Sequence, residues 1–564
     1  MKIKHLWRLV LLALLAAWIF DLLFWERSVG VSYALMVLVL LVVGFGLAWG
    51  EGAKPAWGSL AVLLPVIFFA AMSMLRSEPV TQFVNYGMSL GMMAVLAATL
   101  AGGGWLRYTF IDHVVNQAIL WVKTVAGLGM VVGKQALVTP MDKQGIRHAD
   151  AESAGKLGNK ETSDEEKLSV LSRSTVQSKA NKFSVAAGWL RGLLLAAPLL
   201  LVFGALLAQA DAAFAQSLDD LWALFRIENL PEYIFRMFYV IVLGYVLAGI
   251  YLYAIAESRQ ERISTDAQQR FPILPFTEAS VVLGSVNLLF LAFVLVQFRY
   301  FFGGQANINV AGYTYAEYAR RGFNELVIVA FGSLLLFIGM SKVTRRTGAT
   351  HQRIFTGLGA GLALLVAIML VSAFMRLRLY EAVYGFTRLR LYTHIFMIWL
   401  GGLLVVLIAL ELLGKTRYFA LACLAAALGF GATLNILSVD GFIVKANVGR
   451  AGQGQALDAA YLATLSPEAI PVLVGAFENE RLDAAVHHQL GAALACQATR
   501  SVYQPAASWP EFHLGQYWAA QLLEKLQGEL TAYPLFYTDR AEAIVSVNGV
   551  LQPCFSDDYY WMGD

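Results

Sequence analysis

The segment RLRLYEAVYGFTRLRLY, residues 376–392, places four arginines and three tyrosines between two long apolar runs. Arginine holds a carboxylate or a phosphate through two parallel hydrogen bonds, and its planar group stacks on aromatic rings. A second segment of the same character, residues 313–321, contains Tyr318, Arg320 and Arg321. These residue types and spacings indicate recognition of an anionic group.

Two interpretations of these arginines are open. In the structural one, the arginines extend to lipid phosphates or pair with carboxylates to lock helices together. In the functional one, the inward-facing side chains line an outward-facing pocket for a lipid phosphate, a carboxylated sugar or a peptide terminus. The carboxylates available for locking are Glu317, Glu325, Glu381 and Asp211. The candidate ligand-binding residues are Arg320, Arg321, Arg378, Arg388, Tyr318, Tyr380, Tyr384, Glu317 and Glu381.

The composition places these segments in a membrane. The chain of 564 residues is 58% hydrophobic and 14% charged, whereas soluble domains are about 45–50% apolar and about 25% charged. The apolar residues form eleven runs of roughly the length that crosses a bilayer as a helix. They are 9–25, 31–49, 57–75, 83–101, 190–210, 233–256, 278–298, 324–341, 354–375, 391–412 and 418–437. We therefore expect an all-α polytopic membrane protein with about eleven transmembrane helices and a small helical extracytoplasmic C-terminal domain.

The orientation follows from the basic residues. With a cytoplasmic N-terminus, the long basic loop after the fourth run lies inside, and every cation of the outer loops is an arginine. We expect a bacterial cytoplasmic (inner) membrane protein with an extracytoplasmic C-terminus. A further span within residues 105–135 would invert everything that follows it.

Changes of composition along the chain predict five regions. The segment 139–183 has mixed charges and few large apolar residues, so it is expected to be a disordered cytoplasmic linker. The five regions are a four-span block at 1–104, an interfacial amphipathic segment at 105–138, the linker at 139–183, a seven-span block at 184–439 and a soluble acidic tail at 440–564.

Several individual residues have local predictions. Gly385 is expected to stop one helix and Thr387 to cap the next, which places a sharp turn between the two RLRLY copies. Glu411 and Asp440 lie near the ends of apolar runs, where a charge is expected to reach water. Asn435 lies within a run, and such an amide commonly joins neighbouring helices.

Cysteine usage is sparse. Cys423 lies in an apolar run and is expected to be a small apolar filler. Cys496 and Cys554 both lie in the tail, and an oxidising compartment would permit a disulfide between them.

Motifs of known chemistry are absent from the sequence. It has no phosphate-binding glycine loop, no HExxH, no CxxC and no nucleophile elbow. We expect no cofactor, no metal and no nucleic-acid partner, and enzyme activity is uncertain and not favoured. The leading hypothesis is a protein that binds or moves an anionic or amphipathic molecule at its outer face, with membrane lipid as a partner. The alternatives are a scaffold or sensor acting through the C-terminal domain, and a membrane-embedded transferase using Asp211 and Asp219.

Six segments together resemble an uncharacterised family of bacterial multi-pass membrane proteins. Four of these segments are RGLLLAAPLLLVFGALLAQADAAF (191–214), LGSVNLLFLAFVLVQFRYFFGG (283–304), LNILSVDGFIVKANVGR (434–450) and LDAAYLATLSPEAIPVLV (457–474). The other two are YTYAEYARRGFNELVIVAF (313–331) and the 376–392 segment. The family is a domain of unknown function, of the forty-one fifty-three and forty-one seventy-three type. The resemblance covers about residues 185–475, stops short of the first four spans and the linker, and implies a membrane location, a bacterial source and a helical fold. It brings no catalytic residues.

Overall fold

The computed structural model describes residues 5–126, 230–261, 273–302, 323–500, 508–537 and 543–555. The linker, the run at 190–210, the carboxylates Asp211 and Asp219, and the predicted site residues Glu317, Tyr318, Arg320 and Arg321 lie outside these residues. The chain divides into one unit of residues 1–128 and 243–564 and a second of residues 129–242. The helices, strands and contacts that follow belong to the first unit, except that the first residues of α9 lie in the second.

The described residues contain nine helices that are long and apolar enough to cross a membrane. This confirms a polytopic, predominantly helical fold, while the expected number of eleven spans is not confirmed. The nine are α1 (Leu6–Phe24), α2 (Val31–Gly50), α5 (Pro79–Thr99), α9 (Leu230–Ala256), α10 (Phe276–Phe302), α12 (Phe323–Val343), α13 (Ala349–Tyr384), α14 (Arg388–Leu412) and α15 (Phe419–Leu437). The expected run at 57–75 instead forms two shorter helices, α3 (Trp57–Leu60) and α4 (Leu63–Met72).

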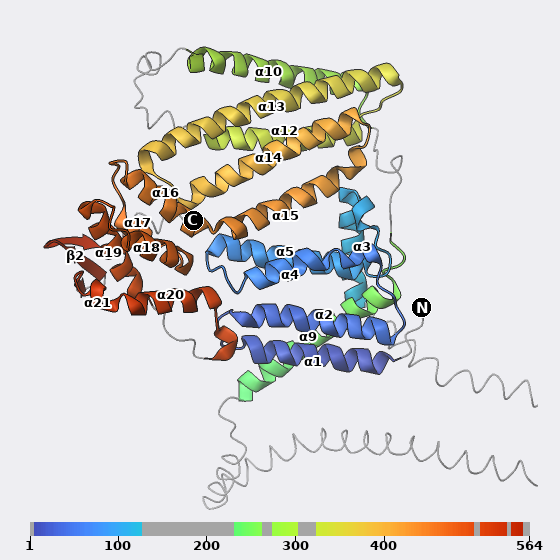
Figure 1. Ribbon diagram of the computed structural model, residues 1–564. Helices are drawn as coiled ribbons and strands as arrows, with labels where there is room; N and C mark the ends of the chain where they lie inside the picture. The colour runs from blue at the N-terminus through green and yellow to red at the C-terminus, as the bar shows by residue number, and fades with distance from the viewer. Residues whose placement is uncertain are drawn as a thin grey trace, which may run out of the picture. The chain divides into compact units, whose positions relative to one another are not determined.

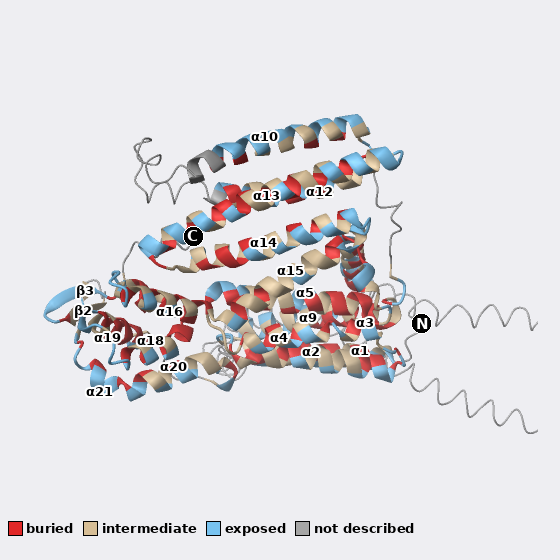
Figure 2. Cartoon of the chain, turned by 45° about the horizontal axis from the view of Figure 1, so that its top comes forward, coloured by how far each residue is buried: buried red, intermediate tan, exposed pale blue. Residues whose placement is uncertain are grey.

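Large apolar side chains remain exposed along these helices. Val42 is 62% exposed, Ile398 62% and Ile436 75%. Figure 2 shows exposed residues spread along the long helices, outside the buried contacts between them. In a bilayer these side chains face lipid tails, and each helix satisfies its own backbone hydrogen bonds.

Polar side chains join the helices where they touch. Asn85 in α5 and Asn435 in α15 exchange two hydrogen bonds between their amides, at 3.1 and 2.7 Å. Asn287 in α10 donates to the Leu358 carbonyl in α13 at 3.1 Å. These pairs confirm that the amides within the apolar runs connect neighbouring helices.

The segment after α5 forms a short 3-10 helix, η1 (Gly104–Arg107), followed by helical residues 110–126. Every fourth residue of this helix is buried, namely Asp112, Asn116, Leu120 and Thr124. A Cβ on Gly249 of α9 would clash with the Thr124 backbone, so the two helices lie in close contact.

The C-terminal domain is helical first and then forms a sheet. Its helices are α16 (Val439–Ala451), α17 (Ala459–Thr464), η6 (Pro467–Ala469), α18 (Ile470–Phe477), α19 (Ala484–Ala498), η8 (Trp509–Glu511), α20 (Leu514–Lys525) and α21 (Gln527–Leu530). The antiparallel sheet has the order β1 (Leu535–Tyr537), β2 (Ala543–Val547), β3 (Val550–Pro553). The expected domain was helical, and the sheet is an addition to that expectation.

A two-residue turn and a disulfide organise the sheet. Asn548 and Gly549 both have positive φ, at 51° and 84°, which is the geometry that a tight hairpin turn requires. Cys554, directly after β3, forms a disulfide with Cys496 in α19, with their Cα atoms 5.3 Å apart. The disulfide therefore ties the sheet to the helices of the domain.

The C-terminal domain contacts helix-end loops that are far apart in sequence. The Val31 amide donates to the Phe512 carbonyl at 2.8 Å, and the Leu514 amide donates to the Met74 carbonyl at 3.1 Å. The Phe386 amide donates to Asn447 Oδ1 at 2.8 Å. Figure 1 shows α16 to α21 gathered at one end of the long helices, with α3 near the other. We call the end of the long helices that contacts the C-terminal domain the domain end, and the end near α3 the opposite end.

Candidate functional site

The two RLRLY copies flank a sharp turn at the domain end. Gly385, with φ of 78°, ends α13, and α14 begins at Arg388. The predicted helix stop is confirmed, since a left-handed residue after a helix favours glycine. Thr387 occupies the N-cap position, but its side chain makes no capping hydrogen bond.

Arg388 binds a carboxylate of the C-terminal domain. Its Nε and Nη2 donate to the two oxygens of Asp440 at 2.8 and 2.6 Å. The Ser466 amide donates to the same carboxylate at 2.6 Å, and the Arg388 amide donates to Tyr461 Oη at 3.0 Å. Asp440 is 0% exposed. The expectation that Asp440 reaches water is wrong, because these donors replace water around a buried charge.

Two other arginines bind the carboxyl end of α13. Arg390 donates to the Gly385 carbonyl and lies 4.3 Å from the centre of the Tyr380 ring. Arg450 donates to the carbonyls of Ala382 and Val383 at 2.9 and 3.0 Å. Cations at a helix C-terminus pair with carbonyls that lack partners within the helix. These contacts favour the structural interpretation of the segment.

The remaining described candidates have different surroundings. Arg378 is exposed, and Tyr384 is 54% exposed and lies against Tyr380. Glu381 is buried, with Oε1 3.0 Å from Nδ1 of His394 in α14. The described candidates therefore differ in exposure and in the residues that they contact.

Glu468 joins the C-terminal domain to the hairpin of α4 and α5. Its carboxylate accepts hydrogen bonds from the amides of Ser77 and Glu78 at 2.9 and 3.1 Å, and from Arg76 Nη1 and Ser438 Oγ, each at 3.1 Å. Burial raises the pKa of Glu468, while Arg76 opposes that shift. One buried carboxylate thus connects three segments.

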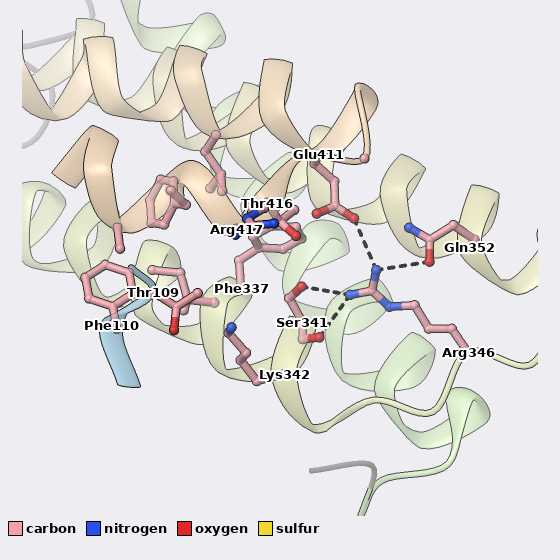
Figure 3. Close-up of a pocket in the computed structure, with 15 residues that line it drawn as sticks. Thr109, Phe110, Phe337, Ser341, Lys342, Arg346, Gln352, Glu411, Thr416 and Arg417 are labelled. Atoms are coloured by element: carbon pink, nitrogen blue, oxygen red, sulfur yellow. Dashed lines mark hydrogen bonds and ion pairs between the residues drawn. The ribbon is translucent and has the colours of Figure 1, made fainter. Parts of the chain in front are cut away.

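A pocket of about 110 Å³ lies at the opposite end of the helices, where α12, α14 and α15 approach residues 109–110 (Figure 3). Three cations line it, namely Lys342, Arg346 and Arg417. Its acidic residue is Glu411, at the end of α14. The pocket is therefore rich in positive charge.

Arg346 and Glu411 form the fixed part of the pocket. Arg346 Nη1 lies 3.3 Å from Glu411 Oε1, and the two side chains are 4% and 3% exposed. Arg346 also donates to Ser341 and Gln352, and its guanidinium lies 3.7 Å from the centre of the Phe355 ring. The expectation that Glu411 reaches water is also wrong, because Arg346 and Thr356 solvate it instead.

Arg417 is the third cation of the pocket and lies 5.5 Å from the centre of the Tyr418 ring. It is half-buried, and its buried Nε makes no hydrogen bond with any described residue. Figure 3 shows Arg417 and Arg346 approaching the pocket from different segments. The guanidinium of an arginine that lines a pocket can donate hydrogen bonds to an acceptor on a bound molecule.

Sequence reasoning missed this pocket. Lys342 lies in the last turn of α12, Arg346 in the loop after it, and Arg417 in the short 3-10 helix η5 (Thr416–Tyr418) after α14. In the sequence they look like ordinary basic residues next to spans. The sequence offers one signal for the pocket. Glu411 ends one span, and basic residues lie in the segments around Arg346 and Arg417 on the same side of the membrane.

Comparison with known proteins gives one family. A family model described as a domain of unknown function (DUF4153) matches residues 63–476. The match begins well before residue 185 and includes most of the run at 57–75, the run at 83–101 and the linker, so the expectation that the resemblance excludes these segments is wrong. The first two runs lie before the match. No curated protein and no solved structure matches the chain.

Proposed function

Because the chain belongs to this family of unknown function, we propose a function from the pocket itself. The protein is a multi-pass membrane protein that binds, or moves, an amphipathic molecule, and it holds the anionic group of that molecule between Arg417, Lys342 and Arg346. The observation that carries the proposal is that Lys342, Arg346 and Arg417, which come from different segments, line one pocket in the described part of the chain.

The cations of the lining support an anion as the ligand. Glu411 pairs with Arg346, and Arg417 and Lys342 line the same pocket. Arginine matches a phosphate or carboxylate through paired donors, and lysine adds a compact charge. A ligand with an anionic group could therefore accept hydrogen bonds from Arg417.

The apolar walls support an amphipathic ligand. Phe110, Phe337 and Phe419 line the same pocket as the cations. The volume of about 110 Å³ suits a headgroup. An attached apolar chain would then run along the lipid-facing surfaces of the neighbouring helices.

The outer arginine segment supports this choice of site. Arg388 and Arg390 already have protein partners in Asp440 and in the end of α13. We therefore assign Arg388 and Arg390 a structural role.

We also place the pocket and the N-terminus on the cytoplasmic side of a bacterial inner membrane. The basic loops around the pocket agree with the positive-inside rule.

Native mass spectrometry of the full-length protein tests the proposal. Wild type is compared with Arg417→Gln, and exposed Arg378→Gln is the matched control. An anionic amphipathic molecule should remain bound to wild type and to the control and be lost from Arg417→Gln. An empty wild-type pocket, or equal retention by all three proteins, would refute the assignment.

A scaffold or sensor is the second candidate. It is favoured by the contacts of the C-terminal domain with the loops at residues 73–78 and 385–387. A partner bound to this domain would act on both blocks of spans. A stoichiometric partner that co-purifies with a wild-type protein lacking any bound anion would favour this function over ligand binding.

A further inference from the structure

Four aromatic side chains of the C-terminal domain form an exposed group, which we name the aromatic patch. Trp509 is 63% exposed, Phe512 36%, Tyr517 49% and Trp518 53%. The opposite side of α20 supplies Ala519 and Leu523 to the domain core. The patch is therefore not required to complete that core.

Backbone contacts hold the aromatic patch at the ends of two apolar helices. The Phe512 carbonyl accepts from the amide of Val31, the first residue of α2. The Leu514 amide donates to the carbonyl of Met74, two residues after α4. The patch thus lies at the level where the apolar helices end.

Two glycines allow the C-terminal domain to pack closely against the loops at these helix ends. A Cβ on Gly30 would lie 2.5 Å from the Glu511 carbonyl, and a Cβ on Gly515 would lie 2.4 Å from the Leu75 carbonyl oxygen. Neither site has room for a side chain, so η8 and the start of α20 lie directly against the loops that end α1 and α4. The C-terminal domain cannot be displaced from this level without breaking those contacts.

Tryptophan and tyrosine are enriched at this depth in membrane proteins. Their rings cover apolar chains, while their NH and OH groups reach headgroup oxygens. The polar side chains exposed farther along α20, Gln521, Glu524 and Lys525, suit the aqueous side of such a boundary.

We propose that the aromatic patch inserts into the headgroup region of the leaflet next to the C-terminal domain and holds the domain against the lipid surface. The occupant of this face is phospholipid, because backbone contacts place the patch at the ends of the apolar helices α2 and α4. The patch carries no formal charge, so contact does not require anionic lipid.

Spin labelling of the full-length protein in bilayers measures the depth directly. The background is Cys423→Ala with the Cys496–Cys554 disulfide intact. Labels are placed at Trp518→Cys and Tyr517→Cys, and the control label is at exposed Glu480→Cys between α18 and α19. Collision rates with oxygen, which dissolves in lipid, are compared with those of a water-soluble nickel chelate.

The labels at 517 and 518 should meet oxygen more often, and nickel less often, than the label at 480. The result should be the same in neutral and anionic phospholipid. Equal nickel access at all three positions would overturn the proposal, because the patch would then face water. Protection of 517 and 518 from both reagents would also overturn it, because a protein would then cover the patch.

Discussion

Arg388 at the start of α14 and Asp440 near the start of α16 form a two-bond ion pair, with oxygen distances of 2.8 and 2.6 Å, although they lie 52 residues apart in sequence. The pair joins the second RLRLY copy to the C-terminal domain. It also explains why an arginine is needed there, since only a forked donor meets both oxygens.

Arg388→Gln should destabilise the protein by about 3–5 kcal/mol, because it leaves the fully buried Asp440 carboxylate without its cation. Arg378→Gln in the first RLRLY copy should cost less than about 0.5 kcal/mol, since Arg378 is exposed. Denaturation of both variants in the same mixed micelles makes the comparison. Equal losses of unfolding free energy in the two variants would mean that the Arg388–Asp440 ion pair does not stabilise the fold.

The contact between α20 and the α4–α5 hairpin should weaken in acid. His513 Nδ1 accepts from the Gln516 amide at 3.4 Å and Nε2 lies 3.1 Å from the Arg76 carbonyl, which fits a neutral ring. Burial lowers the pKa of His513 below its usual value of about 6.5.

The sign of the effect follows from that lowered pKa. Below about pH 6.5 the unfolded chain takes up a proton that folded His513 resists, so this contribution to stability is present at neutral pH and is lost as the pH falls. Hydrogen exchange of residues 514–525 should be faster at pH 5 than at pH 7 after correction for intrinsic rates. His513→Gln should flatten this dependence, whereas His351→Gln should leave it intact; identical profiles for the two would disprove the role of His513.

Loss of the disulfide should loosen the sheet from α19. The bond closes a loop of 58 residues, for which the chain-entropy account gives about 4 kcal/mol. The Cys496→Ala/Cys554→Ala protein should show faster hydrogen exchange in residues 543–555, with little change in α13 and α14. Unchanged exchange in the sheet would show that packing alone holds it.

Arg346 should contribute mainly to the stability of the protein, and Arg417 mainly to ligand binding. Arg346→Gln should cost about 3–5 kcal/mol because it leaves buried Glu411 uncompensated, whereas half-buried Arg417→Gln should cost less than about 1 kcal/mol. Unfolding of the ligand-free proteins measures both values. If Arg417→Gln destabilised the protein as much as Arg346→Gln, Arg417 would be a structural residue.

The spanning helices could be predicted from sequence because lipid imposes a length and an apolar composition on each one. The turn at Gly385 could be predicted because its signal is local. Asn548-Gly549 carries an equally local hairpin signal, because both residues favour the positive φ that a two-residue turn requires.

The pairings of the charged residues could not be predicted in the same way. Asp440 and Glu411 both lie at span ends, where water and protein partners are equally plausible in the sequence. The fold decides the outcome by bringing Arg388 and Arg346 to them over 52 and 65 residues. Lys342, Arg346 and Arg417 likewise meet only in the tertiary structure, and their spacing in the sequence does not predict that they line one pocket.

The affinity of the purified protein for an alkyl phosphate, compared with the uncharged alcohol of the same chain length, tests the central claim most directly. The wild-type protein should bind the phosphate at least about tenfold more tightly, and Arg417→Gln should lose that difference while Arg378→Gln keeps it, since a charge-assisted hydrogen bond contributes about 1.5–3 kcal/mol. Equal affinity of wild type for phosphate and alcohol would contradict an anion site in the pocket.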